Sequence, residues 1–133
     1  MNKELIQIIN IIQYRLEKSM LKADEKYYDF KLGNESRSPN EILSHLVDVS
    51  NYGLSMLAAP KSVNEESPVL KKVNKNLSTM KSFLTEEEID DDTSKRLING
   101  PLSDTLTHIG QLAFLRRLHG SPIEHENFSN ANI

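Results

Sequence analysis

The spacing of its apolar residues constrains this chain more than any other feature. In four stretches, apolar residues recur at intervals of three and four, which places them along one side of a helix. No stretch shows the convincing alternation of apolar and polar residues that is typical of a half-buried strand. The four stretches, each roughly 18 to 25 residues long and joined by loops, predict an all-α protein that folds as a four-helix bundle.

Capping and turn signals predict where the helices begin and end. The segment Ser38-Pro39-Asn40-Glu41 is typical of a helix start, because Ser caps, Pro suits the first position and Glu completes a capping box. Gly120 and Pro122 should end the last helix. We expect long helices at residues 3 to about 27, 39 to 58 or 59, 68–84 and 101–118, and a short extra helix before the last one, at 93–98, which Asn99-Gly100 ends. The acidic run 86–92 should be a solvated connection.

Length, charge and cysteine content narrow the function classes. The 133 residues fit a single domain, residues 1–133. A net charge of -3 supplies no basic surface for nucleic acid. No apolar run is long enough for a membrane span, and Gln and Asn interrupt the first apolar stretch, so we expect a cytoplasmic protein without nucleic-acid or membrane partners. Because the chain has no Cys, its chemistry must come from His, carboxylates, hydroxyls or a cofactor.

Three metal-competent side chains, carried by two of the helices, are expected to converge in the core of the bundle. His45 lies three and four positions from Ile42 and Val49, so it should face the interior of the bundle. Asp104 and His108 lie one turn apart on the last helix, close enough to share one ion. Two imidazoles and a carboxylate suit Zn, Fe, Ni or Mn, and three protein ligands leave positions open for water or substrate.

The same side chains also have ordinary structural interpretations. A buried His often only satisfies a neighbouring hydrogen bond, and Asp104 near a helix start would stabilise the helix dipole. Gln111 could bind metal-bound water, or it could tie its helix to a neighbour. Arg116 and Arg117 should stabilise the C-terminal dipole and pair with acids, and an anion-binding role is the alternative. His119, at the end of the helix, should be solvated.

The last predicted helix and the tail after it resemble the DinB/YfiT-like family. Members share an H-x-G-Q-hydrophobic core followed by Leu-Arg-Arg-Leu and Gly-x-Pro, and the matching residues here are His108, Gly110, Gln111, Leu115, Arg116, Arg117, Leu118, Gly120 and Pro122. The segment SPNEILSHLVDVSNYGLSML resembles the second helix of that family, with His45 at its metal-ligand position. The order of four helices agrees over nearly the whole chain, although the first and third match only in pattern.

The resemblance implies a four-helix bundle that binds one divalent metal through a histidine of the second helix and two residues of the fourth, commonly an H-x-x-x-H pair. His45 and His108 match directly. Asp104 stands where the family has the first histidine of the pair, so this chain departs from the common pattern there. A carboxylate can still ligate, which would give a two-histidine, one-carboxylate set. The resemblance also implies that homodimers are common.

The implied function is that of a divalent-metal-dependent enzyme acting on a small-molecule substrate. It would be either a transferase that uses a low-molecular-weight thiol or a hydrolase, and without Cys the thiol must be external. The metal would lower the pKa of a bound thiol or water. The alternative is a non-catalytic bundle, with or without metal, that binds a ligand or a partner. The departure at Asp104 keeps this alternative open.

Overall fold

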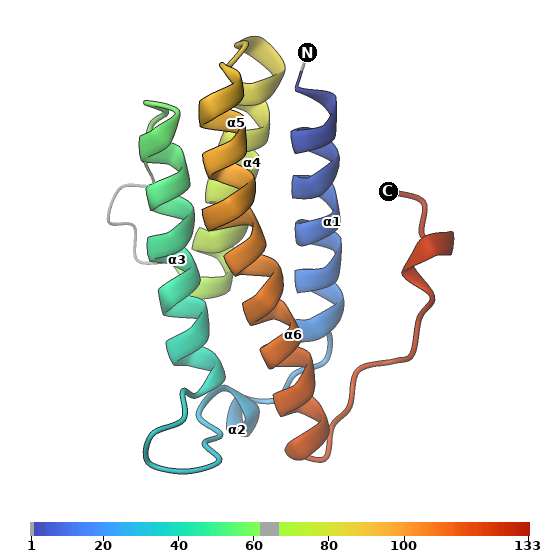
Figure 1. Ribbon diagram of the computed structural model, residues 1–133. Coiled ribbons are helices and arrows are strands. Elements are labelled where there is room, and N and C mark those ends of the chain that lie inside the picture. Colours follow the sequence, from blue (N-terminus) through green and yellow to red (C-terminus); the bar gives the residue numbers. More distant parts are fainter. Residues whose placement is uncertain (1, 62–66) are drawn as a thin grey trace.

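The computed structural model describes residues 2–61 and 67–133, and within these ranges every regular element is a helix (Figure 1). The all-α prediction is confirmed for this part of the chain. Four helices are long: α1 (Lys3–Met20), α3 (Pro39–Met56), α4 (Val69–Glu86) and α6 (Ser103–Leu118). The shorter elements are α2 (Glu25–Tyr28), α5 (Asp91–Leu97), a π-helical segment (Ile98–Leu102) and a 3-10 turn (Phe128–Asn130).

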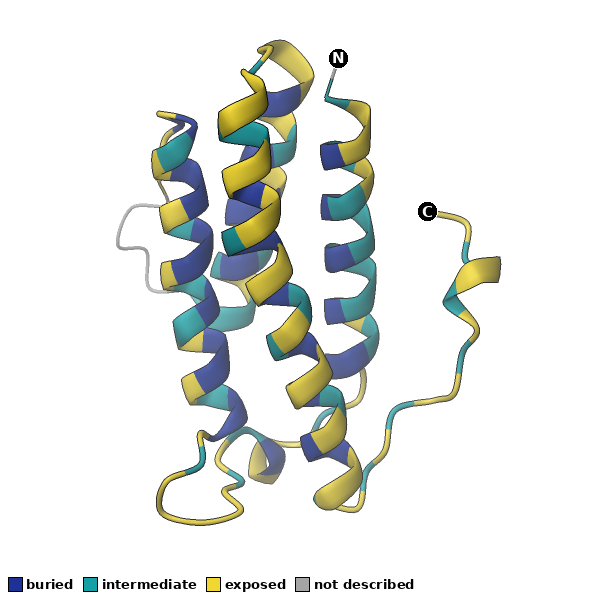
Figure 2. Cartoon of the chain, viewed as in Figure 1, coloured by how far each residue is buried: buried dark blue, intermediate teal, exposed yellow. Residues whose placement is uncertain are grey.

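The long helices pack around one apolar core. Both α1 and α3 contact α4 on one side and α6 on the other, so the four helices enclose a shared interior. Figure 2 shows the buried stripe of each helix facing inward. The fully buried side chains include Ile9, Ile12 and Leu16 of α1, Leu43, Leu46 and Leu54 of α3, Val73 of α4 and Leu112 of α6. The intervals of three and four predict most of these positions, but Leu43 and Leu54 lie outside the predicted stripes.

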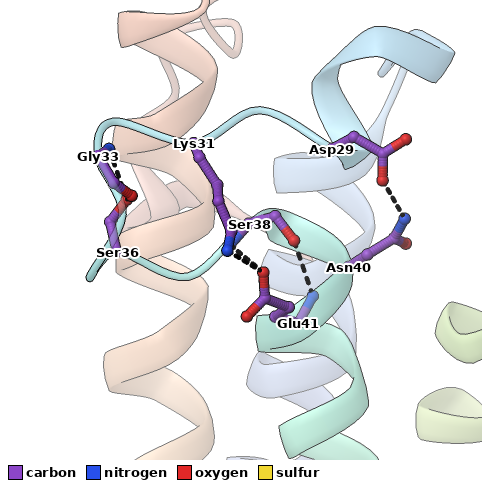
Figure 3. Close-up of polar contacts among 7 residues, drawn as sticks. All are labelled: Asp29, Lys31, Gly33, Ser36, Ser38, Asn40 and Glu41. Atoms are coloured by element: carbon purple, nitrogen blue, oxygen red, sulfur yellow. Dashed lines mark hydrogen bonds and ion pairs between the residues drawn. The ribbon is translucent and has the colours of Figure 1, made fainter.

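The predicted capping box begins α3 (Figure 3). The Glu41 amide donates to Ser38 Oγ at 3.2 Å, and the Ser38 amide donates to Glu41 Oε1 at 3.4 Å. Lys31 forms an ion pair with the same carboxylate at 3.0 Å, which attaches the preceding loop to the helix. The capping residues and Pro39 therefore fix the start of the helix that carries His45.

The first helix is shorter than predicted. We expected it to reach about Tyr27, but α1 ends at Met20. Lys22 adopts a left-handed φ of 60°, which interrupts the helix, and Asp24 caps a new one by accepting from the Tyr27 amide at 2.8 Å. The apolar spacing continues across this break because α2 turns Tyr27 back into the core, where it is fully buried.

The short extra helix is present as α5, but it begins two residues earlier than expected, at Asp91, and Asn99-Gly100 does not end it. The chain continues through the π-helical segment Ile98–Leu102 directly into α6. Pro101 lies inside this segment, where the wider turn accommodates its missing amide hydrogen. Pro101 and Leu102 are buried, so their packing outweighs the helix-breaking tendency of the sequence. The acidic run before α5 is largely exposed.

The last helix ends as predicted, at a left-handed Gly120 with φ of 89°. The amides of Gly120 and Ser121 donate to the carbonyls of Arg117 and Arg116 at 3.2 and 3.0 Å, which is the Schellman pattern. The tail then returns along α1 (Figure 1). None of the helices in the described ranges is long and apolar enough to cross a membrane.

Among the residues that the structure describes, Arg116 pairs with no acid, contrary to our expectation. Its side chain is only 4% exposed and donates to the carbonyls of Ser19, Leu21 and Ser121 at 2.8 to 2.9 Å. Two of these carbonyls lie at the end of α1, so Arg116 joins the end of α1 to the end of α6. Its charge is satisfied by backbone dipoles, which leaves an anion-binding role without support.

Candidate metal centre

The structure brings the three predicted ligand residues together. His45 comes from α3, and Asp104 and His108 come from successive turns of α6. One ligand atom from each side chain can be chosen so that all three lie within 4.8 Å of one another. The two imidazole rings are 4.8 Å apart between centroids and nearly perpendicular, at 84°. Such a spacing lets three donors converge on a single small cation.

The site lies at the rim of the bundle, and the expectation that it lies in the core was wrong. His45 and His108 are half-buried, and Asp104 is exposed. The reason is the register of α6, in which Ile109 and Leu112 take the interior positions. His108 precedes Ile109 by one residue and is therefore rotated toward the edge of the helix that faces α3. A rim position leaves one side of the site open to water.

The surroundings of His45 favour its neutral form. Partial burial lowers the pKa of this imidazole below its ordinary 6.5, and the neighbouring His108 and Arg37 lower it further. The carboxylates of Asp104 and Asp48 act in the opposite direction without cancelling the effect. At neutral pH, His45 therefore carries a free lone pair, which is the state that a metal requires.

Gln111 orients the second imidazole. The Nδ1 of His108 and the Oε1 of Gln111 are 2.8 Å apart, and the amide oxygen can only accept. His108 Nδ1 therefore carries the proton, and Nε2 is left as the lone-pair nitrogen. Gln111 was expected either to bind metal-bound water or to tie α6 to a neighbour, and it does neither within the described residues. It acts instead on a predicted ligand, as hydrogen-bond acceptors commonly do behind metal-bound histidines.

A cleft of about 370 Å³ opens beside His108. Its apolar walls come from Leu32 in the loop before α3, Ile42 of α3 and Phe114 of α6, and Arg37 adds a positive charge. Leu32 and Phe114 are 57% and 59% exposed, so the cleft has apolar surface that is open to water. Sequence reasoning missed this cleft. The one available signal was Phe114, an aromatic residue on the outer side of an otherwise polar helix face.

His119 is not solvated as expected. Its ring packs edge-on against Tyr27 and Phe30, with centroids 5.8 and 5.2 Å apart. Its Nε2 lies 3.3 Å from a carboxylate oxygen of Asp24, the cap of α2. His119 therefore holds α2 against the end of α6 and lies apart from the candidate metal centre.

Comparison of the chain with known protein families, with curated proteins and with solved structures finds no match. The resemblance to the DinB/YfiT-like family therefore stays a prediction. The helices of the described residues and the convergence of His45, Asp104 and His108 stand on the structure alone.

Proposed function

We propose that the chain is a divalent-metal-dependent enzyme of the DinB/YfiT-like kind, in which His45, Asp104 and His108 hold the metal. The observation that carries this proposal is the convergence of three donor atoms from two helices within 4.8 Å. The donor set fits a borderline cation such as Zn, Ni, Fe or Mn, because it combines two imidazoles with one carboxylate. A bound cation would supply Lewis acidity and would lower the pKa of a thiol or water in its open position.

The protein's own residues favour such a role in three ways. His45 is kept neutral by its surroundings, and Gln111 fixes the tautomer of His108, so both imidazoles are prepared for ligation. The adjoining cleft offers apolar contacts for the body of a small-molecule substrate. Arg37 at the cleft supplies a positive charge that would attract an anionic group of a substrate or of an external low-molecular-weight thiol. The reaction class in this proposal, thiol-dependent transfer or hydrolysis, comes from the family resemblance.

Metal analysis of the purified protein is the first test. We expect about one divalent ion per chain, and we expect His45→Ala and His108→Ala to lose it while remaining helical, since each removes one of three ligands. His125→Ala is the matched control, because His125 is exposed on the tail, outside the site. Loss of metal in the control, or retention of metal in both ligand variants, would refute the assignment.

The catalytic part of the proposal needs a separate measurement. The metal-loaded protein is mixed with a low-molecular-weight thiol and an electrophile, and conjugate formation is followed; ester hydrolysis is followed in parallel. We expect turnover that depends on metal and disappears in His108→Ala. A protein that binds metal but shows no turnover in either assay would favour the second candidate.

That second candidate is a non-catalytic bundle that binds a ligand or a partner. The exposure of Asp104 favours it, because a carboxylate in water has solvent as a competing partner. Thermal melts distinguish metal-free from metal-binding forms, since any ion that binds only the native state must raise its stability.

A further inference from the structure

A second cavity lies between α1, α6 and the C-terminal tail. Its volume is about 430 Å³, within the range of roughly 300 to 1,000 Å³ found for small-molecule sites. None of its lining residues belongs to the candidate metal centre or to the cleft beside it. The proposed metal centre therefore does not account for this second cavity.

The tail is held in place over α1 by specific contacts. Tyr14 donates a hydrogen bond of 2.5 Å to Glu126, and Lys18 forms an ion pair with the same carboxylate at 3.7 Å. The Phe128 ring packs edge-on against Tyr14, with centroids 6.1 Å apart. Because these contacts attach the tail to the outer side of α1, the tail forms one wall of the cavity.

The remaining walls are apolar. Ile11 of α1, Leu106 and Ile109 of α6, and Ile123 and Phe128 of the tail supply most of the lining. A surface of this kind favours the hydrocarbon part of a ligand over water.

One positive charge in the cavity has no negative partner. The Arg15 guanidinium lies over the Phe128 ring, 4.3 Å from its centroid, and it forms no ion pair with residues 2–61 or 67–133. Its Nε is buried and has no acceptor within those residues. The neighbouring Lys18, in contrast, is paired with Glu126. A half-buried charge of this kind is unfavourable unless a ligand supplies the missing acceptor.

Gly110 leaves space at the floor of the cavity. A Cβ at this position would meet nothing within 4 Å, whereas one at Gly53 would lie 2.7 Å from Met80. Gly53 is therefore explained by close packing, and Gly110 is not. A glycine in a helix interior lowers stability relative to alanine, and here the lost side chain widens the cavity.

We propose that this cavity binds a small organic anion with an apolar body, represented by a medium-chain monocarboxylate. The carboxylate accepts hydrogen bonds from the Arg15 guanidinium, and the hydrocarbon chain lies over Gly110 between α1 and α6, beneath the tail. The lining agrees with this class, since it offers one cation among mainly apolar side chains, and the hydroxyl of Ser19 is already bonded to the Leu16 carbonyl. The site is separate from the proposed metal centre and does not depend on its activity.

The test uses a tryptophan reporter, because the chain has no Trp. Phe128→Trp keeps an aromatic face for Arg15 and places the fluorophore in the cavity wall. We expect octanoate to change its emission saturably, and octanol and acetate to bind at least about tenfold more weakly, because each lacks half of the recognised chemistry. Phe83→Trp on α4 is the control reporter and should not respond. Equal responses in the two reporters, or no saturable response at all, would overturn the proposal.

Two further substitutions in the reporter background test the assigned residues. Arg15→Gln should weaken octanoate binding about tenfold, and Arg117→Gln, an exposed arginine outside the cavity, should leave it unchanged. Gly110→Leu should abolish octanoate binding, because the added side chain would occupy the part of the cavity that Gly110 lines. Thermal melts establish that each variant is folded. Unchanged affinity in folded Arg15→Gln, or full binding in folded Gly110→Leu, would refute the site.

Discussion

Replacing Gln111 with Met should weaken metal binding without removing a ligand. Met has nearly the length of Gln but cannot take the place of its amide oxygen, so the 2.8 Å contact with His108 Nδ1 is lost. The imidazole is then free to carry its proton on either nitrogen and to rotate. If the two tautomers became equally populated, the competent fraction would fall about twofold. Loss of the ring orientation would lower the competent fraction further.

The expected magnitude follows from the exposure of the contact. Gln111 is exposed, so water partly replaces its amide oxygen, and the net hydrogen bond is worth about 1 kcal/mol. That corresponds to an approximately fivefold loss of metal affinity. This is below the loss of roughly 10- to 100-fold that is typical when better-buried partners of metal-bound histidines are removed.

Competition with a chromophoric chelator at neutral pH would measure the Zn affinity of the wild type, Gln111→Met and Gln7→Met. Gln7 bonds the tail carbonyl of Ile133 at 3.2 Å, far from the site, so its variant controls for loss of a surface amide. Wild-type affinity in Gln111→Met would refute the orienting role. A loss of Zn affinity as large as that of His108→Ala would also refute the orienting role, because it would indicate that Gln111 is itself a ligand.

Further outcomes follow from the same structure. Asp104→His should raise Zn affinity by adding a third imidazole, and Asp104→Ala should lower it; equal affinities in a chelator titration would remove Asp104 from the site. Arg116→Lys should lower the free energy of unfolding by about 2–3 kcal/mol in urea melts, because an ammonium cannot reach three carbonyls in the guanidinium geometry. The metal-induced rise in Tm should vanish as pH falls below about 6.5, since protons then compete for the imidazoles. The metal-free protein should also lose stability there, because the lowered pKa of His45 means that the unfolded chain takes up this proton first; identical melts from pH 4 to 8 would contradict both statements. Sedimentation should show a dimer of 15.1 kDa chains, and a monomer at micromolar concentration would contradict this.

Helix periodicity predicted most of the fold because the interior of this protein is built from helical stripes. The capping box at Ser38 and the glycine at position 120 set two helix ends through local hydrogen bonds. The residues that form such bonds can be recognised in the sequence. The end of α1 was missed because apolar spacing continues past it. Asp24 was the local signal, since an Asp that caps a following turn competes with helix continuation.

The junction before α6 could not be predicted by the same rules. Asn99, Gly100 and Pro101 all favour a break when each is considered alone. The chain stays helical because Leu97, Pro101 and Leu102 are buried together, a tertiary effect that local propensity does not contain. The wider π turn also rotates the residues that follow it, beginning one residue before Asp104.

The composition of the candidate site was predictable from the sequence, and its depth was not. The pairing of Asp104 with His108 follows from one turn of any helix, and His45 follows from the apolar stripe of α3. Burial depends instead on which residue of α6 points inward, and in the structure Ile109 takes that position. An aspartate at such an exposed position is readily hydrated when no metal is bound. The exposed rim and the carboxylate at position 104 therefore suit each other, and exchanging that one residue tests whether the pairing tunes metal affinity.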